Sequence, residues 1–113
     1  MIKIYHNPRC RKSREALQIL QESGKDFEII EYLKESLSFN EVKAIIDLLD
    51  IPPIKLLRKN EAVWKENFKN KELNENEVIE AMVTFPKLIE RPIVINGELA
   101  VIGRPPEKIK ELF

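Results

Sequence analysis

Alternating apolar and polar residues mark the first expected strand, and helical spacing replaces that pattern a few residues later. Residues 2–6 alternate in types that favour strands, and Asn7-Pro8 then indicates a turn. From residue 11 the apolar positions share one face of a helix, and Gly24 has the position of a C-terminal helix glycine. The pattern therefore predicts a strand at 2–6, a helix at about 11–22 and a second strand at 27–33.

The middle of the chain contains helical patterns only. Ser38 and Glu41 have the spacing of a capping box ahead of a helix that runs through Leu49 and is ended by two prolines. Asn74 and Glu77 repeat this cap chemistry before another helix, which ends near the next proline. Short helical turns are expected at 54–57 and 62–68. We therefore predict a helical insertion at about 36–88.

Strand patterning returns near the end of the chain. Apolar stretches at 92–95 and 98–102 flank Asn96-Gly97, a dipeptide that tolerates the positive φ values of a type I′ turn, so a hairpin is predicted. Pro105-Pro106-Glu107 then opens a terminal helix through Phe113. The order β-α-β, helical insertion, β-β-α predicts an α/β fold in a single domain over residues 1–113.

Length and charge narrow the classes of function. The 113 residues suit one domain, and 43% apolar residues are enough for a core. Nineteen basic residues balance nineteen acidic ones, whereas nucleic-acid and membrane-surface proteins need an excess of basic charge, so we expect neither partner. No uncharged run exceeds six residues, which argues against a transmembrane helix or a secretory signal. We expect a cytoplasmic monomer.

The chain has one cysteine, Cys10, and one histidine, His6. A single cysteine excludes an intramolecular disulfide, and together with a single histidine it leaves no plausible zinc site. We therefore expect no metal and no bound organic cofactor. The thiol is either inert or reacts with another molecule.

Cys10 lies between an expected strand end and an expected helix start. The unpaired N–H groups and the positive dipole end of a first helical turn favour thiolate, lowering a pKa that is about 8.5 for a free cysteine. Four basic residues in the seven from Pro8 to Arg14 act in the same direction. Buried, apolar cysteines are common in intracellular proteins, but the charged and polar neighbours here favour a reactive thiolate.

Three further residues of this loop are candidates for supporting roles. Ser13 stands where a CxxC redox motif has its second cysteine, so the site can form a disulfide only with another molecule. Its hydroxyl could donate a hydrogen bond to the thiolate or bind helix N–H groups. His6, if protonated, could stabilise the thiolate, although a packed core role is commoner. We expect the side chain of Asn7 to bind nearby backbone.

Arg58, Arg91 and Arg104 are candidates for the same site. Arg91 precedes the third expected strand, Arg104 follows the hairpin, and Arg58 follows the apolar run of the insertion. Each could equally be a solvated surface arginine. If they converge, their guanidinium groups form a site for a tetrahedral oxyanion, which an adjacent thiolate could attack.

Four blocks of the chain resemble, in order, the glutaredoxin-coupled (ArsC-like) arsenate reductase family. They are His6-Asn7-Pro8-x-Cys10-x-x-Ser13, Leu56-Leu57-Arg58-Lys59-Asn60, Arg91-Pro92-Ile93-Val94 and Gly103-Arg104-Pro105. The resemblance covers nearly the whole chain. It implies a thioredoxin-like fold with a mixed four-stranded sheet and a cis peptide bond before Pro92.

The resemblance also implies roles for the candidate residues. Cys10 would be the nucleophile on arsenate, Arg58, Arg91 and Arg104 would hold the oxyanion, and His6 and Ser13 would tune the thiolate. Glutathione would attack the cysteine–arsenate adduct, and glutaredoxin would then remove glutathione from the protein. The single cysteine agrees with this cycle, because electrons have to come from another molecule.

Two alternatives remain open at this point. The first is a glutathione-dependent thiol oxidoreductase that acts on another substrate. The second is a non-enzymatic regulator of the Spx type, which has the same fold, binds RNA polymerase and carries an Arg-Pro-Ile segment like Arg91-Pro92-Ile93. Regulators of that type usually sense oxidation with a CxxC pair and have a longer C-terminus than this chain.

Overall fold

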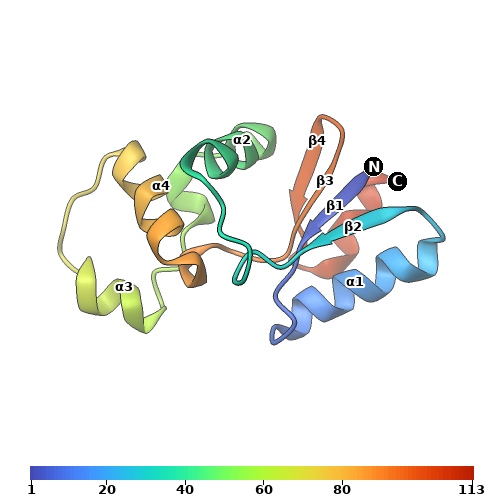
Figure 1. The fold of residues 1–113 in the computed structure, drawn as a ribbon, viewed down its shortest axis with the longest axis horizontal. Coiled ribbons are helices and arrows are strands. Elements are labelled where there is room, and N and C mark those ends of the chain that lie inside the picture. Colours follow the sequence, from blue (N-terminus) through green and yellow to red (C-terminus); the bar gives the residue numbers. More distant parts are fainter. The chain divides into compact units, whose positions relative to one another are not determined.

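The computed structural model describes residues 1–113 (Figure 1). Its elements are β1 (Ile2–Tyr5), α1 (Arg11–Ser23), β2 (Phe27–Ile30), α2 (Phe39–Leu49), η1 (Pro53–Leu56), α3 (Ala62–Asn67), α4 (Glu75–Thr84), η2 (Pro86–Leu88), β3 (Ile93–Asn96), β4 (Leu99–Ile102) and η3 (Pro106–Leu112). The chain divides into two compact units, one made of residues 1–35 and 91–113 and the other of residues 36–90. The second unit covers nearly the range expected for the helical insertion.

A four-stranded sheet in the order β2-β1-β3-β4 forms the centre of the first unit. The β1 and β2 strands are parallel, whereas the β1–β3 and β3–β4 pairs are antiparallel. In this register Ile4 of the inner strand β1 pairs with Ile29 on one side and with Val94 on the other. The β-α-β and β-β-α halves therefore share one mixed sheet, which is the thioredoxin-like arrangement.

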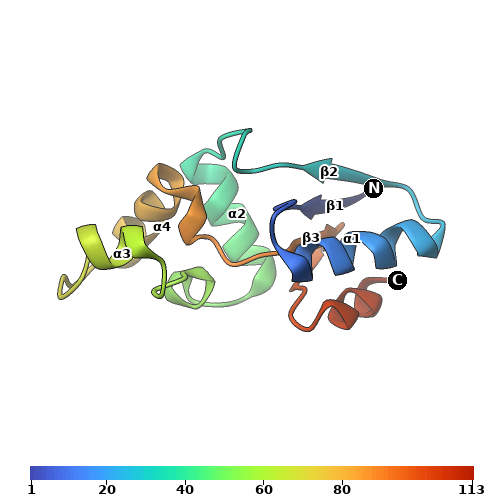
Figure 2. The same cartoon turned by 90° about the horizontal axis from the view of Figure 1, so that it is seen from below.

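Two helices cover one face of this sheet, α1 and the C-terminal 3₁₀ helix η3 (Figure 2). Buried apolar side chains from the sheet and from both helices form the core between them: Ile2, Ile4, Ala16, Leu20, Val94, Ile109 and Leu112. Each such side chain stabilises the fold by roughly 1.5–3 kcal/mol when it is fully buried, apart from the smaller alanine. This packing holds α1 against the sheet, with its first residue just beyond the end of β1.

The helix boundaries agree with the cap chemistry in the sequence. Helix α1 ends at Gly24, whose φ of 73° lies in the left-handed region. Both expected capping boxes form: Ser38 and Glu41 bind each other's backbone N–H at the start of α2, and Asn74 and Glu77 do so at the start of α4. The predictions for these three helix ends are confirmed.

Two strand predictions are wrong in detail. Strand β2 ends at Ile30, not at residue 33. The chain turns there, because the N–H of Tyr32 donates a hydrogen bond to the carbonyl of Ile30. In the hairpin, Asn96 pairs with Leu99, so the turn residues are Gly97 and Glu98. Only Gly97, with a φ of 62°, has a positive φ, which is the pattern of a type II′ turn and not of the expected type I′ turn.

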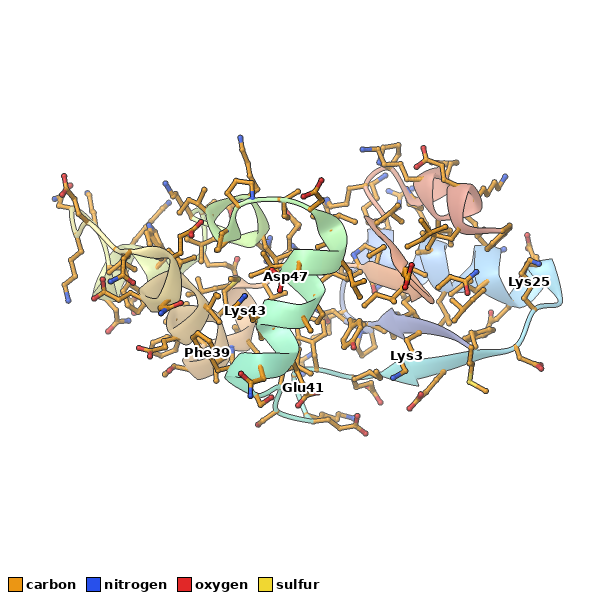
Figure 3. All side chains as sticks on the ribbon, turned by 90° about the horizontal axis from the view of Figure 1, so that it is seen from above. Lys3, Lys25, Phe39, Glu41, Lys43 and Asp47 are labelled. Atoms are coloured by element: carbon orange, nitrogen blue, oxygen red, sulfur yellow. The ribbon has the colours of Figure 1, made fainter.

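The second unit contains α2, α3, α4 and two short 3₁₀ helices. Figure 3 shows Lys43 and Asp47 one turn apart on α2, where they form an ion pair of 3.3 Å. The rings of Trp64 and Phe68 stack at 5.1 Å, and Phe85 meets Phe68 edge-on. None of the helices combines the length and the apolar character needed to span a bilayer.

Candidate active site

Cys10 caps the N-terminus of α1. Its backbone is extended, with φ −93° and ψ 122°, and its N–H donates to the carbonyl of Asn7 at 3.0 Å. The residue is only 7% exposed and its sulfur forms no disulfide. The loop after β1 thus places the thiol at the first turn of α1, where the backbone N–H groups have no hydrogen-bond partners within the helix.

The electrostatic surroundings favour the thiolate form of Cys10. Burial acts most strongly and raises the pKa of the thiol. The backbone N–H of Ser13, the charge of Arg91, the backbone N–H of Lys12 and the side chain of Arg104 all lower it. Together they outweigh burial, so the pKa of Cys10 lies below its ordinary value, in the direction that the sequence indicates.

Two of the three candidate arginines lie at this thiol. Nη1 of Arg104 is 3.9 Å from the sulfur of Cys10 and donates to the carbonyl oxygen of Arg91 at 3.2 Å. The same guanidinium therefore binds both the nucleophile and the backbone of the second arginine. Both arginines come from the ends of the β3–β4 hairpin, which the pairing of β3 with β1 brings to the Cys10 loop.

Close backbone packing joins the two arginine segments. The N–H of Gly103 donates to the carbonyl of Pro92 at 2.8 Å. A Cβ at position 103 would lie 2.9 Å from Cγ of Pro92, so only glycine fits without a shift. The Arg91–Pro92 peptide bond is cis, as the resemblance implies, and the Arg104–Pro105 bond is cis as well, which the sequence did not indicate.

The side chains of His6 and Ser13 bind each other and not the sulfur. Nδ1 of His6 is 2.6 Å from Oγ of Ser13, which also accepts the N–H of Asn7 at 3.0 Å. Burial lowers the pKa of His6; Glu31 raises it and Arg14 lowers it further, so the net shift is downward and the ring is neutral near pH 7. The side chain of His6 therefore bonds to Ser13, and its part in tuning the thiolate stays a prediction. Ser13 reaches the thiol through its backbone N–H and not through its hydroxyl.

The remaining loop contacts are local. Oδ1 of Asn7 accepts the N–H of Arg9 at 3.0 Å, which is the backbone bond that the sequence predicts for this asparagine. Nη1 of Arg14 donates to the carbonyl of Pro8 at 3.0 Å. Sequence reasoning had counted Arg14 only as a source of charge. Its position four residues after Cys10, one helical turn further on, is the signal that could have indicated a contact with this loop.

Arg58 belongs to the second unit. Its guanidinium pairs with Glu61 at 3.3 Å and with Glu90 at 3.7 Å, and its side chain is 16% exposed. Its backbone N–H donates to the carbonyl of Leu88. These bonds fix Arg58 within that unit, and its part in an oxyanion site stays a prediction.

The arrangement at Cys10 suits nucleophilic attack on a tetrahedral oxyanion. A thiolate attacks well when its pKa is lowered, and guanidinium groups bind the oxygens of an anion through paired N–H donors. Two guanidinium groups at the thiol supply the positive charge that would draw such an anion to the sulfur.

Comparison with known proteins agrees with this description. The model of the ArsC family matches residues 5–112 of the chain. The chain belongs to the ArsC family. A relative of this ArsC-family protein in Haemophilus influenzae, named arsenate reductase, is 42% identical over 112 residues, which are 97% of each chain. Another, the arsenate reductase of Neisseria meningitidis serogroup B, is 38% identical over 114 residues and covers 99% of this chain and 97% of its own.

A solved structure has the same fold over the full length. The arsenate reductase from Vibrio cholerae superposes with a TM-score of 0.93 at 39% identity, covering 99% of this chain and 97% of that one. The ArsC-family protein therefore has the thioredoxin-like fold with a mixed four-stranded sheet that its sequence predicts.

Proposed function

We propose that this ArsC-family protein is an oxidoreductase that reduces arsenate, with Cys10 as its nucleophile. The observation that carries the proposal is a thiol of lowered pKa that lies 3.9 Å from the guanidinium of Arg104. Relatives named arsenate reductase, at 38–42% identity over nearly the whole chain, support the choice of substrate.

In the first step the Cys10 sulfur attacks the arsenic of dihydrogen arsenate. A sulfur–arsenic bond forms, one arsenic–oxygen bond breaks, and the departing oxygen leaves as water after taking up a proton. Arg91 and Arg104 neutralise the charge on the arsenate oxygens, which lets an anionic nucleophile approach an anionic substrate. Arsenic remains in the +5 state in the adduct.

In the second step the thiol of glutathione attacks the sulfur of Cys10. A disulfide forms between glutathione and Cys10, the sulfur–arsenic bond breaks with its electron pair passing to arsenic, and arsenic(III) leaves as arsenite with the thiol proton. A thiolate of glutaredoxin then attacks the glutathione sulfur of this mixed disulfide, a disulfide forms between glutaredoxin and glutathione, the old disulfide bond breaks, and Cys10 leaves as a thiolate. An external thiol is required because the chain contains no second cysteine.

A coupled assay tests the proposal. Arsenate, glutathione, glutaredoxin, glutathione reductase and NADPH are combined with the protein, and NADPH consumption that depends on both arsenate and protein is expected. Cys10→Ser should abolish it, because serine is not a nucleophile at neutral pH without a base. A rate equal to that of Cys10→Ser would refute arsenate reduction, whereas arsenate-independent reduction of a glutathione mixed disulfide would indicate a thiol oxidoreductase with another substrate.

Two variants separate the contributions of the arginines. Arg104→Gln removes the side-chain bond to the sulfur and should both raise the pKa of Cys10 and weaken arsenate binding. Arg58→Gln tests the role that the resemblance gives to Arg58. It should raise KM for arsenate without changing the pKa of Cys10, because Arg58 is not among the groups that shift this pKa. An unchanged KM would remove Arg58 from the proposed site.

A further inference from the structure

A groove runs between α3 and α4 within the second unit, and Figures 1 and 2 both show these helices side by side. It consists of two cavities, of about 340 and 320 Å³, which share Thr84 and Phe85 as a common wall. We refer to the two cavities together as the α3–α4 groove. Both volumes lie at the lower end of the range of ligand pockets, so each cavity can admit a large side chain.

The walls of the α3–α4 groove contain apolar side chains that the fold leaves partly exposed. Helix α3 has no buried residue. The rings of Trp64 and Phe68 stack at 5.1 Å, and Phe85 meets Phe68 edge-on at 5.9 Å, yet none of the three is fully buried. Contiguous apolar surface with a polar border is typical of interaction sites, so the groove is a candidate binding surface.

The charge beside this apolar surface is acidic. Glu77 and Glu80, three residues apart on one face of α4, line the first cavity. From residue 72 to residue 86 the chain has no basic residue and four acidic ones: Glu72, Glu75, Glu77 and Glu80. None of these four carboxylates forms an ion pair within the protein. Charge complementarity therefore favours a basic ligand.

A cation of the chain itself already lies at the first cavity. Nζ of Lys71 is 6.0 Å from the centre of the Phe68 ring, within the range of a cation–π contact, and Lys71 lines this cavity. The Lys71 side chain is exposed and has no ion-pair partner, so a ligand can displace it into solvent. A guanidinium suits the cavity best, because it stacks on aromatic rings and also pairs with carboxylates.

The second cavity has different chemistry. Its walls include Val63, Phe85 and Pro86, and its charged residue is Lys87. No carboxylate lines it. It therefore suits an apolar side chain.

We propose that the α3–α4 groove binds a segment of a partner protein that presents an arginine and an apolar side chain on the same side. The arginine occupies the cavity of Glu77 and Glu80, and the apolar side chain occupies the cavity of Val63 and Pro86. In an extended segment, side chains two residues apart lie on one side about 6.6 Å from each other, which suits two cavities with a common wall. The groove contains none of the candidate active-site residues, so this binding does not depend on arsenate reduction.

Peptide binding to the full chain, followed by Trp64 fluorescence, tests the proposal. Trp64 is the only tryptophan and stacks on Phe68 in the wall of the groove, so a bound peptide changes its surroundings. The probe is acetyl-Gly-Arg-Ser-Leu-Gly-amide. Replacing its arginine with glutamine should weaken binding about three- to ten-fold, because an ion pair and a cation–π contact are lost. Replacing its leucine with serine should weaken binding about five-fold or more, because apolar burial is lost.

Four protein variants locate the binding. Glu80→Gln should weaken binding of the arginine peptide about two- to five-fold, the range of an exposed ion pair, and should leave the glutamine peptide unaffected. Thr84→Phe places a ring in the wall of both cavities from an exposed position and should weaken binding about ten-fold or more. Lys71→Gln should strengthen binding, because it removes a competing cation. Glu98→Gln removes an equal charge from an exposed turn of the first unit and should change nothing.

The outcomes either support or overturn the inference. Equal affinity for the arginine and glutamine peptides overturns it, and so does an equal loss in Glu80→Gln and Glu98→Gln or the absence of binding at millimolar peptide. A dimer in sedimentation experiments that Thr84→Phe dissociates also overturns it, because a second copy would then cover the groove. The expected order of affinities in a protein that fails to reduce arsenate would support the inference and refute the proposed function alone.

Discussion

Substituting Gly103 with alanine tests how the two arginines are held at the thiol. Gly103 directly precedes Arg104, and its N–H binds the carbonyl of Pro92, next to Arg91. The added Cβ would lie 2.9 Å from Cγ of Pro92 and 3.2 Å from Cγ2 of Ile109. Pro92 and Ile109 are both fully buried, and the proline ring is stiff, so the segment carrying Arg104 has to move.

The size of the effect follows from two opposing contributions. Overpacking a buried position costs about 1–3 kcal/mol of folding free energy. The φ of Gly103 lies outside the left-handed region, so alanine is compatible with the backbone and gains about 0.4–1 kcal/mol from a less flexible unfolded chain. The net expectation is a loss of about 1–2 kcal/mol. The displaced Arg104 should also raise the pKa of Cys10, because its bond to the sulfur is already long at 3.9 Å.

Gly24→Ala is the matched control. Gly24 has a φ of 73° and no atom within 4 Å of an added Cβ, so alanine there loses about 1–2 kcal/mol through backbone strain alone. It lies at the end of α1 opposite to Cys10. Urea unfolding measures the stability of both variants, and thiolate absorbance as a function of pH measures the pKa of Cys10. Both variants should lose stability, and only Gly103→Ala should shift the pKa.

Two results would refute this reasoning. Wild-type stability of Gly103→Ala would show that Pro92 and Ile109 yield to the new methyl group without cost. The expected loss of stability with an unshifted Cys10 pKa would show that contact between these backbone segments does not determine where Arg104 lies.

Three further predictions concern stability. Because the pKa of Cys10 is lowered in the folded state, the thiolate contributes to the free energy of unfolding, which should rise with pH up to about 8.5. This contribution is lost as the pH falls through the folded-state pKa. Urea unfolding at a series of pH values should show this dependence of stability on pH, and Cys10→Ser should remove it. Ser13→Ala leaves the buried ring of His6 and the N–H of Asn7 without their partner and should cost about 1–3 kcal/mol in urea unfolding. Ser38→Ala removes a helix cap and should cost about 1 kcal/mol while the titration of Cys10 stays unchanged.

Features set by neighbouring residues could be predicted from the sequence. Gly24 and the two capping boxes depend on bonds within one helical turn, and they form as expected. The hairpin turn lies one residue later than the sequence predicts, and Asn96 is the last residue of β3 instead of a turn residue. There its side-chain amide donates to the carbonyl of Leu112, which is distant in the sequence, at 2.8 Å. Such a contact has no signature in the local pattern, which favoured Asn96 as a turn residue.

In the candidate site, too, local features could be predicted from the sequence and long-range contacts could not. Cys10 could be identified from its position between a strand and a helix, whereas the approach of Arg104 depends on how β3 and β4 pair with β1. The bond between His6 and Ser13 could not be predicted, because it depends on side-chain rotamers in a buried loop. From the sequence, Ser13 could bind the thiolate or helix N–H groups and His6 could stabilise the thiolate or pack in the core, but a bond between the two side chains was not expected.

The first unit is built from residues 1–35 and 91–113, so the two arginines reach the Cys10 thiol only after these segments have come together. Cys10 and Arg104 are 94 residues apart in sequence, and Arg91 is also in the final segment. During synthesis the cysteine emerges from the ribosome long before either arginine, so an unfinished chain carries a thiol that both guanidinium groups have yet to reach. The part of the lowered Cys10 pKa that Arg91 and Arg104 supply therefore requires contact between the first and last segments, whereas the part that the backbone of Ser13 and Lys12 supplies is local to α1.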